Sequence, residues 1–179
     1  MRPRIREKYG SALLLLGVLT LCVAARWPAL INSNALHSDA AIVGLQGRHM
    51  LRGEFNSHLW GTPYQGSLEP FLCALGFLAL GAKPIVVMWV ALVGHMLATS
   101  FVFLTLNRRV GRWAAALLVM PLVFAPWAVN AAALFPPRQW AITLVLCAIW
   151  LLDGAADSRR PLLSVGLALF FGAVSVWVD

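Results

Sequence analysis

The side chains best suited to acid–base chemistry in this chain are gathered in one stretch, residues 36–70. It holds three of the seven acidic residues and three of the four histidines: Asp39, Glu54, Glu69, His37, His49 and His58. A carboxylate placed there can accept the proton of a hydroxyl that attacks as a nucleophile. The histidines have no regular metal-ligand spacing, so the stretch indicates acid–base chemistry and no metal site.

Two of these acids also have a purely structural explanation. Asp39 follows Ser38, and Glu69 lies two residues after Ser67. Serine is a favoured helix N-cap, and an acid in the first helical turn is stabilised by the positive end of the helix dipole. The sequence therefore predicts helices that begin near Ser38 and Ser67. It leaves both a catalytic and a helix-stabilising role open for each acid.

Basic residues in the same part of the chain could bind an anion. Arg48 and Arg52 are four residues apart, which places them on one face of a helix that we expect to end at Gly53. Such a pair suits a phosphate clamp, and it equally suits contact with lipid headgroups. Lys83 and Arg138 are further cations next to apolar runs, and Arg138 has the alternative role of an interfacial anchor.

The composition excludes a water-soluble globule. Of the 179 residues, 60% are hydrophobic and only 12% are charged, about half the charged share of soluble domains. The mean hydropathy is +0.78. The net charge of +7 comes from basic residues that flank apolar runs. These residues therefore indicate orientation in a membrane and no binding of nucleic acid.

The apolar runs predict an all-α, polytopic membrane protein with about five spans and a single domain over 1–179. The predicted spans are 11–25, 84–106, 114–132, 139–152 and 162–178, judged against the roughly 20 residues that cross a bilayer. A sixth run, 67–82, is interrupted by Pro70, Gly76 and Gly81. We expect it to be an interfacial or re-entrant helix. An external segment over about 27–83 would then contain two short helices.

The basic clusters set the orientation. If 67–82 does not cross, the clusters at 107–112 and 158–160 lie on the same side as the basic N-terminus. The positive-inside rule places that side in the cytoplasm. We therefore expect an integral protein of the bacterial plasma (inner) membrane, with a cytoplasmic N-terminus and residues 27–83 outside.

The external segment resembles the start of a GT-C-fold membrane glycosyltransferase, the class that includes glycosyltransferase family 39 and the protein O-mannosyltransferases. The resemblance covers residues 36–82 most strongly. Its elements are Ser38-Asp39-Ala40-Ala41, the turn Leu51-Arg52-Gly53, the stretch from Trp60 to Pro70, and a Phe-x-x-x-Gly helix end. On this resemblance the chain is the N-terminal part of a larger GT-C-like fold. Many relatives have a second acid where this chain has Ala40.

The resemblance implies transfer of a sugar from a polyprenyl-phosphate donor to a lipid or glycan acceptor at the outer face of the membrane. It gives the catalytic role to Asp39, with Glu69 as a second acid. It gives substrate binding to the remaining candidates: Arg48, Arg52, Tyr64, Lys83 and Arg138. No cofactor follows from the residues, although the class is compatible with a divalent metal. The other expected contacts are membrane lipids.

Two other kinds of function remain alternatives. The chain could be a non-catalytic membrane module or a truncated remnant of such an enzyme, in which case its 179 residues would be inactive alone. It could also be a small transporter or flippase. The transporter is the weaker alternative because the predicted spans contain one histidine, His95, and no pair of carboxylates for a proton relay.

The predicted orientation can be tested by labelling single cysteines in a cysteine-free background. A cysteine introduced at Ser57 should react with a membrane-impermeant maleimide in intact cells. Cysteines introduced at Gly111 and Ser158 should react only after the membrane is opened. Labelling of the Gly111 position in intact cells would contradict the orientation.

Overall fold

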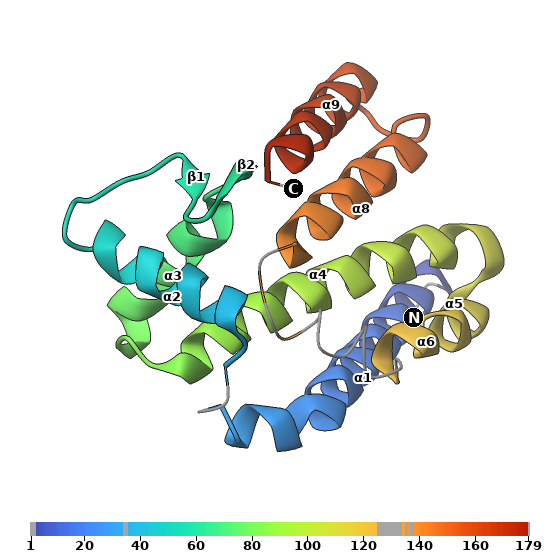
Figure 1. The fold of residues 1–179 in the computed structure, drawn as a ribbon. Coiled ribbons are helices and arrows are strands. Elements are labelled where there is room, and N and C mark those ends of the chain that lie inside the picture. The colour runs from blue at the N-terminus through green and yellow to red at the C-terminus, as the bar shows by residue number, and fades with distance from the viewer. Residues whose placement is uncertain (1–2, 34–35, 125–133, 135, 137, 179) are drawn as a thin grey trace.

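The computed structural model describes residues 3–33, 36–124, 134, 136 and 138–178. In agreement with the expected all-α class, 77% of the chain is helix and 4% is strand. Helices α1 (Pro3–Ile31), α4 (Pro84–Val110), α8 (Gln139–Asp153) and α9 (Pro161–Val178) form a row in which α4 lies between α1 and α8 (Figure 1). The short helices α5 (Arg112–Leu118) and α6 (Met120–Val123) pack on α1.

Three described helices are long and apolar enough to cross a membrane: Tyr9–Ile31 within α1, α4, and α9. The structure therefore supports a membrane protein but does not show five clear spans. Helix α8 has only 15 residues. The predicted span 114–132 is broken at Val119, next to Pro121, because proline cannot donate a helical hydrogen bond. The part of that span beyond Phe124 lies outside the described residues.

The bundle has two distinct ends. At one end Asp153, the last residue of α8, forms ion pairs with Arg108 and Arg109 of α4. The start of α1 lies at the same end, since Ser11 donates a hydrogen bond of 3.5 Å to Asn107. Helices α4 and α8 therefore run in the same direction, and α1 runs against them. The turn between α8 and α9 falls at this end with its two arginines.

At the opposite end a compact unit lies outside the helix bundle; it comprises residues 36–80 and is called the external unit for its place beside the bundle. Helix α2 (Ser38–Met50) packs on α3 (Leu68–Leu80), and a hairpin of β1 (His58–Leu59) and β2 (Thr62–Gly66) joins them (Figure 1). The two expected short helices are confirmed. The hairpin was not expected, since 61–66 reads as a turn-rich loop.

Gln46 holds the hairpin to α2. Its buried side chain donates a hydrogen bond of 2.9 Å to the carbonyl of His58 and accepts one of 3.0 Å from the N–H of Trp60. Gly47 permits the close packing of α2 on α3, because a Cβ atom there would lie 2.9 Å from the carbonyl oxygen of Pro70. Gln46 and Gly47 therefore hold the hairpin and α3 close to α2, next to an apolar cluster that includes Val43, Leu59 and Phe77.

The first span extends further than the sequence predicted, and it includes Arg26. The sequence placed the end of the span at residue 25, but α1 continues to Ile31 and Arg26 is only 2% exposed. Its guanidinium donates hydrogen bonds of 3.0–3.2 Å to the carbonyls of Cys22, Leu122 and Val123. It also lies 3.1 Å from Nε2 of His95. A broken helix leaves carbonyls without partners at membrane depth, and Arg26 satisfies those at the end of α6.

Replacing Arg26 with methionine should destabilise the fold. The carbonyls of Leu122 and Val123 would lose their charged donor, which costs about 2–4 kcal/mol. We expect the melting temperature in detergent to fall by about 5–15 °C. Arg159, an exposed arginine in the turn before α9, provides the matched control, and Arg159→Met should leave the melting temperature unchanged. Equal melting temperatures for the two variants would refute this role of Arg26.

Candidate functional site

The candidate site residues fall into two groups. Asp39, Arg48, Arg52 and Lys83 are all exposed. Asp39 and Arg48 belong to α2, Arg52 follows its end, and Lys83 precedes α4. Arg138 links the remaining three residues, since its backbone N–H donates to Glu69 and it lines one cavity with Tyr64. The structure thus brings together only the second group.

Asp39 lies in the first turn of α2, as expected. The N-cap residue is His37, although the sequence favoured Ser38, and no side-chain capping bond forms there. The hydroxyl of Ser38 instead donates to Asp39 at 3.3 Å, and Nδ1 of His37 lies 3.9 Å from the carboxylate. Asp39 is therefore open to solvent and accessible to a hydroxyl-bearing molecule.

Arg48 and Arg52 lie away from the interior of the external unit. Helix α2 buries one face against α3 through residues such as Ala40, Val43 and Gly47, and both arginines are exposed. Neither lines a described cavity near α8. Their surroundings suit headgroup contact as well as a clamp, so the two readings of this pair remain open.

Glu69 joins the external unit to the bundle. It is only 2% exposed, and its Oε1 atom accepts hydrogen bonds from the backbone N–H groups of Trp140, at 2.9 Å, and Arg138, at 3.4 Å. The first N–H groups of a helix have no partners within the helix, so a carboxylate at this position satisfies them. The first turn of α8 is thus held by an acid 71 residues earlier in the chain.

The backbone at Arg138 is strained. Arg138 has φ = 151°, the only positive φ among the described non-glycine residues. Such a conformation costs on the order of 1–3 kcal/mol and persists only where surrounding contacts impose it. The hydrogen bonds to Glu69 are among those contacts. Glu69 therefore fixes the position from which the Arg138 side chain extends.

Burial raises the pKa of Glu69 to about 7, because the carboxylate loses its hydration. The backbone N–H of Trp140 acts in the opposite direction and lowers the pKa. The second carboxylate oxygen, Oε2, is buried and has no hydrogen-bond partner among the described residues. Glu69 is thus a buried acid that can gain or lose a proton near neutral pH.

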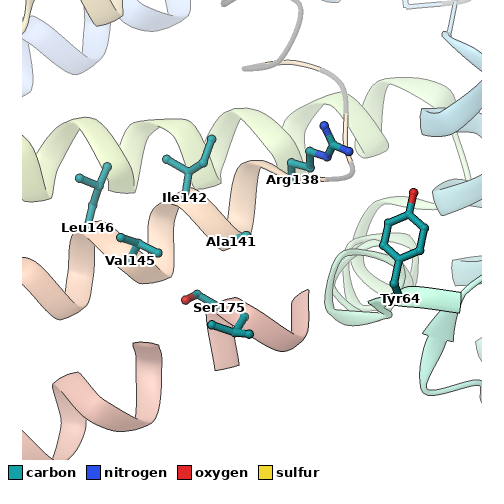
Figure 2. Close-up of a pocket in the computed structure, with 8 residues that line it drawn as sticks. Tyr64, Arg138, Ala141, Ile142, Val145, Leu146 and Ser175 are labelled. Carbon is teal, nitrogen blue, oxygen red and sulfur yellow. The ribbon is translucent and has the colours of Figure 1, made fainter. Parts of the chain in front are cut away.

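A cavity of about 860 Å³ begins at Arg138 and Tyr64 and continues between α8 and α9. Figure 2 shows these two residues at one end and the side chains of Ile142, Val145 and Leu146 along its length. The remaining lining residues are Ala141, Ser175 and Val176. The cavity therefore has one polar end and a long apolar wall.

The hairpin that carries Tyr64 is held against the end of α9. A Cβ atom on Gly66 would lie 2.6 Å from the ring of Trp177, so only glycine allows this approach. Tyr64 itself remains 67% exposed. The contact keeps the hairpin at the mouth of the cavity, and Tyr64 with it.

Sequence reasoning missed two features of this region. Gln139 and Ser175 are polar residues in apolar helices, and both are buried beside α8 and α9. Their isolation in apolar runs was the available signal. Glu54, expected on a solvated loop, is exposed and pairs with His49 at 2.7 Å. Among the described residues, no three His, Cys, Asp or Glu side chains come together as a metal site.

Comparison of the chain with protein-family models, curated proteins and solved structures gives no match. The resemblance to GT-C glycosyltransferases therefore stays an expectation from the sequence. The site is defined by its own chemistry, which consists of a buried acid, a strained arginine and a tyrosine beside an apolar cavity.

The raised pKa of Glu69 predicts how stability depends on pH. Because the folded protein binds this proton more tightly than the unfolded chain, stability should fall as the pH rises from about 4.5 to about 7 and then level off. The full effect is about 3 kcal/mol. Melting curves between pH 4 and pH 8.5 should show this loss in the wild type and not in Glu69→Gln. Parallel curves for the two proteins would refute it.

Proposed function

We propose that the chain belongs to an enzyme that transfers a sugar from a polyprenyl-phosphate donor to a lipid or glycan acceptor at the outer face of the membrane. The cavity between α8 and α9 carries this proposal. Its apolar wall suits a hydrocarbon chain, and Arg138 and Tyr64 at its end suit a phosphate. An amphipathic lipid with an anionic head has this distribution of polarity.

Exposed apolar side chains along one side of the cavity support entry of the donor's hydrocarbon chain from the bilayer. Ile142 and Val145 on α8 are 49% and 44% exposed, and Val176 on α9 is 79% exposed. An isoprenoid chain that covers them removes apolar surface from contact with the surroundings while its phosphate stays near Arg138. The donor would then lie with its sugar next to the external unit.

In the proposed reaction the acceptor hydroxyl attacks the anomeric carbon. A new C–O bond forms, the bond to the lipid phosphate breaks with inversion, and a carboxylate takes the hydroxyl proton. We assign this base to Asp39, which is exposed at the start of α2. Because Asp39 does not line the cavity, this assignment requires the donor sugar to extend from the phosphate at Arg138 to the start of α2. Arg138 stabilises the negative charge on the leaving phosphate. Glu69 positions Arg138.

We further propose five membrane passes with a cytoplasmic N-terminus. The described contacts support this because the basic residues of α4 and of the turn before α9 share one end of the bundle with the start of α1. The external unit lies at the other end, and α8 starts there beside Glu69. Helix α8 and the turn that follows it would together cross the membrane.

Binding of a short donor analogue tests the proposed function. Farnesyl methyl phosphate, an isoprenyl phosphodiester, should bind the purified chain in nanodiscs. Loss of a charged hydrogen bond costs about 1.5–3 kcal/mol, so Arg138→Ala should weaken binding by about 10- to 100-fold. Arg52→Ala removes an exposed arginine of the external unit as a matched control and should leave Kd within about twofold.

Two other results would redirect or refute the assignment. A loss of affinity in Arg52→Ala with none in Arg138→Ala would move the phosphate to the exposed face of α2. An unchanged Kd in both variants, or no binding by the wild type, would refute the role of the cavity. Farnesol, which lacks the phosphate, should bind at least tenfold more weakly than the phosphodiester.

A further inference from the structure

Glu69 lies directly behind the proposed phosphate site. Its Oε1 atom is 3.4 Å from the backbone nitrogen of Arg138, whose side chain lines the cavity. Its Oε2 atom is buried and unpartnered among the described residues. One oxygen therefore holds the wall of the site in place, and the other can carry a proton.

The surroundings of Glu69 contain few other charges. On α3 itself, burial raises the pKa of the Cys73 thiol, and the charge of Glu69 raises it further. Just before α8 the charged neighbour is Arg138, and α2 contributes the uncharged Gly47 next to Pro70 and Cys73. Helix α4 also packs on α3, and it carries Lys83 at its N-cap and the buried His95. On the hairpin, Tyr64 is the titratable residue near the site. Glu69 is thus the carboxylate nearest to the cavity end among the described contacts.

We propose that binding of an anionic lipid headgroup at Arg138 is coupled to uptake of a proton by Glu69. This inference rests on the proposed function, since it requires an anion in that cavity. A negative charge near Arg138 repels a second negative charge on Glu69, and the low dielectric of the buried site strengthens the repulsion. Protonation at Oε2 removes the repulsion and leaves Oε1 free to accept the N–H of Trp140.

The direction of the effect follows from the pKa of Glu69, which is about 7 in the free protein. Anion binding raises this pKa, so the complex binds more protons than the free protein above pH 7. Affinity should therefore fall as the pH rises from 6.5 to 8.5, by up to about tenfold per pH unit. A phosphodiester probe does not titrate in this pH range, so the change of affinity with pH reports on ionisable groups of the protein.

The test compares the pH dependence of binding in three proteins. Farnesyl methyl phosphate should bind wild-type chain in nanodiscs at least threefold more weakly at pH 8.5 than at pH 6.5. Glu69→Gln keeps an acceptor for the N–H of Trp140 and should bind equally well at both pH values. Glu54→Gln removes an exposed acid of the external unit as a matched control, and it should retain the wild-type slope.

Proton uptake can also be measured in the wild type alone, which avoids reliance on folding of the variant. Calorimetric titration at pH 7.5 in buffers of different ionisation enthalpy should show a net uptake of a fraction of one proton per phosphodiester bound. Zero uptake, or a slope that persists in Glu69→Gln, would overturn the coupling while leaving the lipid site intact. Absence of binding at every pH would overturn the proposed function and the coupling together.

Discussion

One carboxylate, that of Glu69, joins the external unit to the membrane bundle. It lies in the first turn of α3 and accepts the N–H of Trp140 at the start of α8. The position of Arg138 at the polar end of the cavity depends on this bond, which adds to the packing of α2 and α3 on α4 and of β2 on α9. The cost is the dehydration of an acid, which the helix N-terminus offsets only in part, so the group keeps a pKa near 7.

Arg26 is the corresponding buried cation. Among the described residues no carboxylate pairs with it, and its charge is balanced by three backbone carbonyls. Two of these belong to the end of α6, where a helix C-terminus carries partial negative charge. Arg26 and Glu69 are therefore both stabilised largely by helix ends.

Local patterns predicted the parts of the fold that depend on nearby residues. Long apolar runs predicted α1, α4 and α9. The helix expected to end at Gly53 ends at Met50, and Gly53 closes the turn that follows, with φ = 86°. Contacts between distant residues could not be predicted. Nothing near Glu69 in the sequence indicates Trp140 as its partner, and Arg26 looked like the end of a span because a charge there usually marks the interface.

The candidate site was predicted as a set of residues but not as an arrangement. All seven residues carry suitable chemistry, yet only Glu69, Tyr64 and Arg138 meet. Periodicity placed Arg48 and Arg52 on one face of a helix, but α2 ends at Met50, so only Arg48 lies on the helix, on a face that points away from α3. That direction is decided by Gly47, through its contact with Pro70 and Cys73.

The separation of Glu69 from its partner also has a consequence during biosynthesis. The contacts of α2, the hairpin and α3 with one another lie within residues 38–80, and Val86 and Val87 at the start of α4 complete their apolar cluster, so this unit can form early in synthesis. The start of α8 is made 71 residues after Glu69, which takes about 4–14 s at the usual rate of synthesis. Glu69 lacks this partner during that interval. Packing of α8 is thus the step that completes the hydrogen bonding of Glu69.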